Sequence, residues 1–186
     1  MGHHTFDAGE AAKLEDAAAR YRSVSRAELL WALGLTGTET VVDLGSGTGF
    51  YTDDVAPHAE RVYAVDVQEA MHDHYRAKGV PANVGLVTSE IEDLPFDDGE
   101  LDAAVSTMTY HEFATDTAFA ELARVLPSGG RLVVADWSAD GPGEDGPPVD
   151  ERFTEDEAAT AFEAAGFDVE FRATRLETFL VVAARR

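Results

Sequence analysis

Short apolar runs alternate with segments of helical periodicity along this chain, and no other feature constrains its fold as much. Runs of strand length occur at residues 40–44, 61–66, 83–88, 101–106 and 130–136. Helix-like segments lie between or after them, near residues 51–58, 68–78, 116–126 and 154–165. Strands that alternate with helices are typical of a parallel sheet covered on both faces. We therefore predict a doubly wound α/β fold.

The two ends of the chain depart from this alternation. Residues 1–36 carry apolar side chains at helical spacing, which predicts a helical cover. Residues 166–171 and 178–183 have no helix between them and favour an antiparallel pair. The stretch 138–150, rich in Gly, Pro and acid, is expected to be a flexible connection. A chain of 186 residues is expected to form one domain, with cover 1–36 and core 37–186.

The composition argues against several classes of function. There are 36 Asp and Glu against 14 Lys and Arg, a formal net charge of -22. Such a surface disfavours nucleic acid and anionic membranes as partners. Cysteine is absent, which excludes disulfides, zinc thiolates and a Cys nucleophile. No apolar run approaches the roughly 18 residues of a membrane span, and the first residues lack signal-peptide regions. We expect a cytoplasmic protein without membrane insertion.

The basic residues are also unusual, because only Lys13 and Lys78 are lysine. An acidic excess with almost no lysine resembles proteins from salt-accumulating halophiles. At molar salt the Debye length is about 3 Å, so the repulsion between surface carboxylates is screened. The alternative is an acidic protein from a mesophile.

A glycine-rich segment, VVDLGSGTGFYT at residues 41–52, follows the first apolar run. Glycines at Gly45, Gly47 and Gly49 permit positive φ and let a ligand approach the backbone. Their spacing, G-x-G-x-G, is one residue shorter than the dinucleotide fingerprint. Asp43 precedes the first glycine, and a carboxylate there suits a ligand with an ammonium group and disfavours pyrophosphate. The segment therefore predicts a ligand site, and its glycine spacing and Asp43 argue against a nicotinamide dinucleotide as the ligand.

A second carboxylate, Asp66, ends the next apolar run about 20 residues after the glycines. At that position it can accept hydrogen bonds from ribose hydroxyls, as any adenosine-containing cofactor would require. The alternative is a helix N-cap ahead of Val67.

Four motifs together resemble those of class I S-adenosylmethionine-dependent methyltransferases. They are DLGSGTG, AVD, residues 89–96 (SEIEDLPF) and residues 121–136 (ELARVLPSGGRLVVAD). The similarity is strongest to the small-molecule group that includes quinone-biosynthesis C-methyltransferases. It implies a Rossmann-like, mostly parallel seven-stranded sheet, S-adenosylmethionine as cofactor, and methyl transfer to a small-molecule acceptor.

The resemblance assigns the methionine and ribose ends of the cofactor to particular residues. Asp43 would orient the methionine ammonium, and Asp66 would hold the ribose hydroxyls. The backbone near Ser106 and Thr107 would line the methionine tail. The loop that passes under methionine and ribose would consist of Gly45, Ser46, Gly47 and Gly49.

The same resemblance places the adenine ring. Val67 would lie against its face, and the N–H of Ile91 would meet a ring nitrogen. Relatives usually carry an Asp for the adenine amino group where this chain has the longer Glu90. Met71 would pack on the adenine, although a Met on a helix also serves as ordinary core filling.

One candidate for a catalytic role is His111, in the segment that follows the fourth apolar run. Relatives often read Leu-His-His here, whereas this chain reads Tyr110-His111-Glu112. An imidazole titrates near neutral pH and can act as a general base. The alternatives are a histidine that only shapes the pocket or one that contacts the cofactor.

Methyl transfer from a sulfonium is favoured in a dry site, so we expect residues 1–36 and 107–115 to cover the sheet edge. The candidate pocket walls are Phe6, Tyr21, Tyr51, Met108, Tyr110 and Trp137. Ordinary packing would explain these side chains equally well.

No metal site is predicted. His72 and His74 are two residues apart on an expected helix and do not share a face. His3, His4 and Asp7 form a short terminal group. Two other functions remain open, a nicotinamide-dependent oxidoreductase and a non-catalytic S-adenosylmethionine-binding accessory protein. The identity of the acceptor and the oligomeric state do not follow from the sequence.

Overall fold

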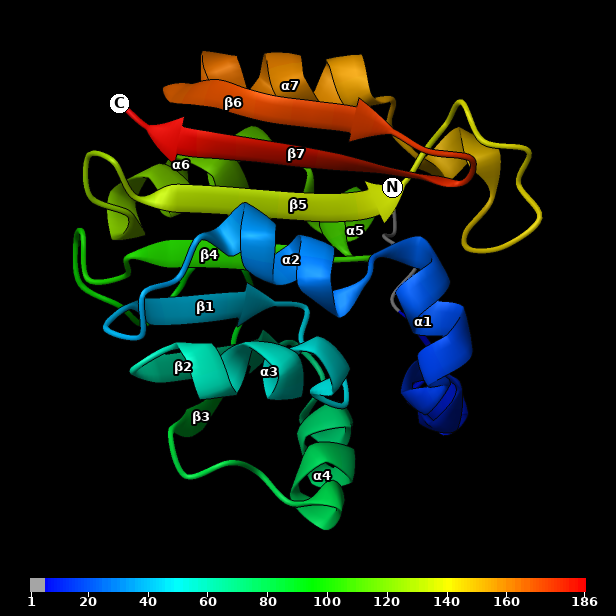
Figure 1. The fold of residues 1–186 in the computed structure, drawn as a ribbon, viewed down its shortest axis with the longest axis vertical. Helices are drawn as coiled ribbons and strands as arrows, with labels where there is room; N and C mark the ends of the chain where they lie inside the picture. The colour runs from blue at the N-terminus through cyan, green and yellow to red at the C-terminus, as the bar shows by residue number, and fades with distance from the viewer. Residues whose placement is uncertain (1–5) are drawn as a thin grey trace.

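A seven-stranded sheet with the order β3-β2-β1-β4-β5-β7-β6 forms the centre of the protein (Figure 1). The computed structural model describes residues 6–186. The strands are β1 (Thr40–Leu44), β2 (Arg61–Asp66), β3 (Val84–Thr88), β4 (Ala103–Thr107), β5 (Arg131–Trp137), β6 (Phe167–Thr174) and β7 (Thr178–Arg185). Strands β1 to β5 pair in parallel, and β7 runs antiparallel to β5 and β6. This confirms the predicted mostly parallel sheet with its antiparallel C-terminal pair.

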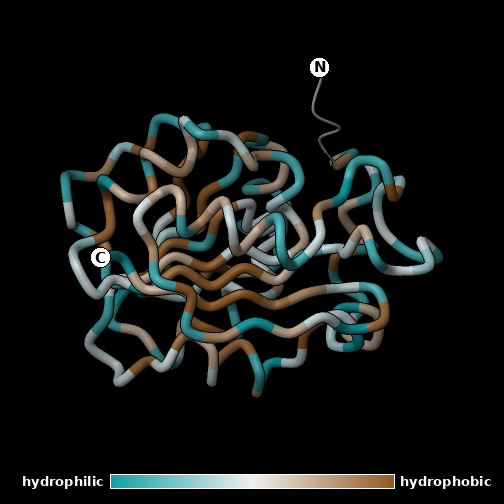
Figure 2. The backbone as a smooth tube through the Cα atoms, turned by 90° about the horizontal axis from the view of Figure 1, so that it is seen from above, coloured by the Kyte–Doolittle hydropathy of each residue, from teal (hydrophilic) through white to brown (hydrophobic). Residues whose placement is uncertain are grey.

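Helices cover both faces of the sheet. They are η1 (Ala8–Glu15), α1 (Ala17–Ser23), α2 (Arg26–Leu33), α3 (Phe50–Val55), η2 (Ala56–His58), α4 (Glu69–Lys78), α5 (Tyr110–Phe113), α6 (Asp116–Val125), η3 (Val149–Glu151) and α7 (Glu155–Ala164). On one face α2 and α3 pack with Val41 and Val62, and on the other α5, α6 and α7 pack with Val42 and Val65. Successive strand residues point to opposite faces, so each apolar run supplies both cores, which appear as the brown centre of Figure 2.

Local sequence sets the bounds of the N-terminal helices. The Asp16 side chain accepts backbone N–H groups at the start of α1, and Ser25 Oγ accepts the Glu28 N–H at the start of α2. Gly34 ends α2 with a φ of 61°. These are ordinary N-cap and C-cap devices. The expected N-terminal helices are therefore present, and Figure 1 shows α1 beside the carboxyl ends of the central strands.

The fourth strand begins later than predicted. It starts at Ala103, which pairs with Arg131, the first residue of β5. Leu101 instead lies in the segment before β4, where its N–H donates to the carbonyl of Val125, the last residue of α6, at 3.0 Å. A buried leucine next to a strand looks the same in sequence as a leucine within it.

Residues 138–150 are tied to the sheet by Arg152. Its Nη1 lies 3.0 Å from a carboxylate oxygen of Glu177, and its Nε donates to the Pro147 carbonyl at 2.9 Å. The guanidinium also lies over the Trp137 ring, and Glu177 accepts backbone N–H groups of the loop. The expectation of a flexible connection missed this anchoring, because the partners lie far apart in the chain.

Candidate functional site

Carboxylates gather where the central strands end. Asp43, Asp66 and Asp136 lie at or next to the last residues of β1, β2 and β5. The register of the parallel pairs brings these ends to one edge of the sheet. Open α/β sheets bind their ligands at this edge.

The glycine loop between β1 and α3 needs glycine for two reasons. Gly45, Gly47 and Gly49 have φ values of 71°, 55° and 80°, which disfavour other residues. A Cβ on Gly45 would come within 2.3 Å of the Thr109 side chain, and one on Gly49 within 2.2 Å of the Tyr75 ring. The Thr109 and Tyr75 side chains therefore pack closely against the loop backbone and leave no room for a Cβ at these two glycines. The sequence motif alone does not reveal this contact.

Asp43 is buried below this loop. One carboxylate oxygen accepts the Thr52 hydroxyl at 2.5 Å, and the other has no partner among residues 6–186. Burial raises the pKa of Asp43 to about 6, against the opposing effects of Thr52 and the nearby Arg20. A buried carboxylate oxygen without a donor is costly, and an ammonium group would satisfy it.

Asp66 is half-buried and faces the loop from β2. One of its oxygens accepts the Gly47 N–H at 2.9 Å, and the other accepts the Gln68 N–H at 2.9 Å. The second contact is a local turn and not the N-cap considered from the sequence, because Gln68 is the N-cap residue of α4 and no side chain caps that helix. The first contact ties the Asp66 carboxylate to the glycine loop.

The N-terminal segment lies over this loop. Leu14 of η1 lies 3.1 Å from where a Cβ on Gly47 would be. Glu15 accepts the Thr48 hydroxyl and pairs with Lys78. The Phe6 carbonyl accepts Gln68 Nε2 at 2.8 Å. The cover is therefore joined to the loop and to the segment after β2 by polar contacts.

The residues expected around adenine lie in different environments. Val67 is 41% exposed and Glu90 is also exposed, so both are accessible. Met71 and Ile91 are buried. Met71 therefore has almost no accessible surface, as the core-filling alternative requires.

The end of β4 carries an unusual backbone. Met108 has a φ of 60°, and within residues 6–186 it is the one non-glycine residue with a positive φ. Its N–H donates to the Ala135 carbonyl at 2.8 Å, and Thr109 next to it donates to the Gly45 carbonyl at 3.3 Å. Such strain is often held at functional sites. Thr107 and Ser106 are buried there, and the Ser106 hydroxyl has no partner among the described residues.

His111 is held by Asp136, a pairing that the sequence analysis did not foresee. One oxygen of the buried Asp136 accepts the His111 backbone N–H at 2.7 Å and lies 2.9 Å from Nδ1 of the ring. A carboxylate at Nδ1 makes this nitrogen the donor and leaves Nε2 to accept a proton. Nε2 lies 3.9 Å from a carboxylate oxygen of Glu112. The available signal was that Asp136 ends a strand, as Asp66 does.

Charges around His111 raise its pKa. Burial lowers the pKa of His111, but the hydrogen bond and charge of Asp136, with the charges of Glu112 and Glu151, outweigh burial and leave it above 6.5. Burial raises the pKa of Glu112 to about 7, helped by Asp66 and Asp136 and opposed by His111. Glu112 therefore takes up a proton near neutral pH, and at 3.9 Å its oxygen is beyond hydrogen-bond distance of Nε2.

Two predicted pocket walls belong to the core instead. Tyr51 is 2% exposed, and its hydroxyl donates to the carbonyls of Arg20 and Val24. Tyr110 is 1% exposed and packs against Phe113, Phe162 and other rings. Neither side chain has surface left for an acceptor, because each ring fills a space between helix and sheet.

The other predicted walls keep some surface. Tyr21 is 38% exposed and donates its hydroxyl to Asp54 at 2.9 Å. Phe6, Met108 and Trp137 are partly buried. Their role in lining an acceptor site stays a prediction.

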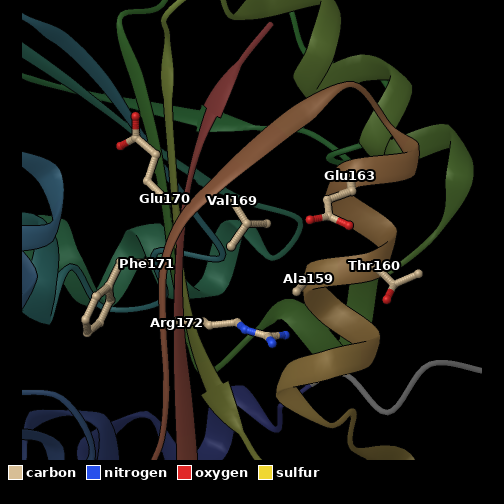
Figure 3. Close-up of a pocket in the computed structure, with 7 residues that line it drawn as sticks. All are labelled: Ala159, Thr160, Glu163, Val169, Glu170, Phe171 and Arg172. Carbon is tan, nitrogen blue, oxygen red and sulfur yellow. The ribbon is translucent and has the colours of Figure 1, made fainter.

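A hollow elsewhere lies between α7 and the edge strand β6 (Figure 3). Its lining residues are Ala159, Thr160, Glu163, Val169, Glu170, Phe171 and Arg172. Strand β6 is the outermost strand next to β7, so this hollow is separate from the carboxylate edge.

Residues 6–186 contain no group of three or more His, Asp or Glu side chains arranged to hold a metal ion. No helix among them is both long and apolar enough to cross a membrane. His3 and His4, considered with Asp7, lie outside the described residues.

Comparisons with known proteins bear on this geometry. The methyltransferase domain family matches residues 42–134. A crystal structure of an S-adenosylmethionine-dependent methyltransferase from Aquifex aeolicus superposes with a TM-score of 0.86 at 30% identity, covering 96% of this chain and 98% of that one. The chain belongs to the S-adenosylmethionine-dependent methyltransferases. This confirms the resemblance, and it sets aside the nicotinamide alternative.

Curated relatives of this methyltransferase are longer proteins. A biotin biosynthesis bifunctional protein from Cellvibrio japonicus is 34% identical over 129 residues, which are 68% of this chain and 26% of that protein. A demethylmenaquinone methyltransferase from Corynebacterium kroppenstedtii is 36% identical over 101 residues, 54% of this chain and 42% of that protein. The chain spans about half the length, or less, of the curated relatives it matches.

Proposed function

We propose that this chain transfers the methyl group of S-adenosylmethionine to a small-molecule acceptor. When bound, this cofactor supplies a methyl group activated by a positively charged sulfur. The observation that carries the proposal is the buried Asp43 oxygen without a donor, beside a loop that only glycines fit. A ligand with an ammonium group would donate to this unpaired carboxylate oxygen.

The proposed cofactor contacts follow the geometry of the edge. Asp43 would accept the ammonium group, and the free lone pairs of Asp66 would accept ribose hydroxyls. The accessible Val67 would lie against adenine, with Glu90 and the Ile91 N–H at its rim. The demethylmenaquinone methyltransferase and the Aquifex protein support the choice of cofactor through the family.

Asp66→Ala should weaken binding of S-adenosylhomocysteine by about 1–3 kcal/mol, because charge-assisted hydrogen bonds are lost. Isothermal titration calorimetry measures this affinity. Asp73→Ala, on the exposed side of α4, removes an equal charge nearby and should leave the affinity unchanged. Equal affinities of wild type and Asp66→Ala would remove Asp66 from the site.

His111 would take the proton of the acceptor. Asp136 holds Nδ1, so Nε2 is the free atom of the ring. Glu112, 3.9 Å from Nε2, would stabilise the protonated ring by its charge when it is ionised. A general base is needed when the acceptor atom carries a proton, as the oxygen of a phenol or an activated carbon does. The carboxylates around His111 disfavour an anionic acceptor. The arrangement of His111 and Asp136 also favours an enzyme over a non-catalytic accessory protein.

We further propose that the chain works in a cytoplasm of high salt concentration, without nucleic acid or membrane partners. The net charge of -22 supports both statements. The melting temperature should rise substantially between low salt and molar KCl, since salt screens repulsion between surface carboxylates. Differential scanning calorimetry across that range tests it, and a flat or falling melting temperature would contradict salt adaptation.

A further inference from the structure

Glu112 holds a mostly buried carboxylate that forms no ion pair with a lysine or arginine among residues 6–186. Its side chain is 19% exposed, and the imidazole Nε2 of His111 lies 3.9 Å from one of its oxygens. The carboxylate accepts the backbone N–H of Phe6, and burial raises the pKa of Glu112 to about 7. A buried carboxylate without a charged donor is costly, so a cation beside Glu112 would stabilise it.

The position of Glu112 is fixed from two sides. Thr109, the N-cap of α5, donates its hydroxyl to the Gly45 carbonyl at 3.3 Å, and its own carbonyl accepts the Glu112 N–H at 2.9 Å. On the other side lies Phe6, whose carbonyl accepts Gln68 Nε2 at 2.8 Å. Glu112 therefore lies between the glycine loop, the N-terminal segment and the residues that follow β2.

The charges around this carboxylate are mostly negative. Asp66 and Asp136 act on the pKa of Glu112, and Asp136 and Glu151 act on that of His111. Among these groups only the imidazole can be positive, and its Nδ1 already lies 2.9 Å from Asp136. No lysine or arginine of the described residues is among the groups that act most strongly on either pKa. This end of the site therefore attracts a cation.

Two buried polar atoms near the end of β4 indicate that a ligand completes this place. The His111 side chain is 8% exposed, and its Nε2, which faces Glu112, makes no hydrogen bond within residues 6–186. The Ser106 hydroxyl, one residue before the end of β4, is buried and also lacks a partner there. Buried polar atoms are nearly always paired, so these two point to a polar group that the protein itself does not supply.

We propose that the methyl acceptor carries a positively charged nitrogen group, which binds at the Glu112 carboxylate. The inference rests on the proposed function and names the chemical class of its acceptor. The sulfonium of the cofactor is also positive, so without carboxylates at this end the two cations would repel each other. A cation at Glu112 also keeps that carboxylate ionised, and in this state it stabilises the protonated ring of His111.

The charge of the acceptor can be tested before the acceptor is identified. A small-molecule extract is separated at pH 7 on a cation exchanger, and each fraction is incubated with the full chain and an excess of labelled S-adenosylmethionine. Methyl transfer should be confined to the fraction that the exchanger retains. Transfer to the unretained fraction would overturn the inference, because the carboxylates would then stabilise the sulfonium alone. An unfractionated extract that gives no transfer would instead contradict the proposed function.

Glu112→Gln separates binding of the acceptor from proton transfer at His111. Its half-maximal rate should require roughly ten- to a hundredfold more of the retained fraction, the usual effect of losing one charge-assisted hydrogen bond. Its affinity for S-adenosylhomocysteine, measured by calorimetry, should equal that of wild type. Glu112→Asp keeps the charge and should lie between the two.

Glu163→Gln is the matched control, because it removes the same charge from an exposed position on α7. It should need no more of the retained fraction than wild type does. A Glu112→Gln protein with the wild-type requirement would overturn the inference. So would one in which only the maximal rate falls, because that result would leave Glu112 a role through His111 and none in binding the acceptor.

Discussion

Replacing His111 with alanine should lower methyl transfer roughly 10²–10⁴-fold, the usual contribution of a positioned general base. The affinity for S-adenosylhomocysteine should stay nearly unchanged, because the ring faces Asp136 and Glu112. The rate is measured as transfer of labelled methyl groups from S-adenosylmethionine to a small-molecule extract. Calorimetry supplies the affinity.

If His111 is a general base, the rate of methyl transfer should depend on pH in a definite direction. The ring accepts a proton only when Nε2 is unprotonated, and the pKa of His111 is raised above 6.5. The wild-type rate should therefore fall on acidification, through a pKa higher than that of an ordinary histidine. Glu112, with a pKa of about 7, faces Nε2, so the profile reports the pair rather than one residue. Asp136 and Glu151 are the other carboxylates acting on His111.

Two variants separate the alternatives for His111. Asp136→Asn keeps the size of the side chain but no longer requires a donor at Nδ1, so it should lower the rate and move the pH profile to lower pH. If His111 only shapes the pocket, His111→Gln should retain most activity with an unmoved profile. If it contacts the cofactor, affinity for S-adenosylhomocysteine should fall together with the rate.

The sequence predicts the sheet well because buried parallel strands are short apolar runs with a helix after each. The bounds of β1 and β2 agree with the structure at both ends. The start of β4 does not, because pairing with β5, rather than apolarity, decides where that strand begins. The pattern of apolar residues indicates which residues are buried. The bounds of a strand also depend on its hydrogen bonds with the neighbouring strand, which that pattern does not show.

The site is less predictable because its parts come from distant segments. Asp136 meets His111 only through the packing of α5 against the end of β5. Tyr51 and Tyr110 show the converse difficulty, since an aromatic side chain suits a pocket wall and a core equally well.

The glycine loop offers a prediction on stability with a matched control. Gly49→Ala places a Cβ within 2.2 Å of the Tyr75 ring at a φ of 80°. Gly129→Ala meets nothing within 4 Å at a φ of 83°. The left-handed backbone costs both variants about 1–2 kcal/mol. Gly49→Ala should lose about 1–3 kcal/mol more from overpacking, as measured by denaturant unfolding.

The extra loss can be traced to the ring itself. Tyr75 is buried and its hydroxyl donates to Asp53 at 2.6 Å, so the ring cannot turn away without breaking that bond. In a Tyr75→Ala background, Gly49→Ala should therefore lower the free energy of unfolding by no more than Gly129→Ala does. The effects of Gly49→Ala and Tyr75→Ala on that free energy should then not be additive. Additive losses would mean that the loop moves rather than the ring. In that case Gly49→Ala should weaken S-adenosylhomocysteine binding more than it lowers stability, because the displaced loop carries the Gly47 N–H that holds Asp66.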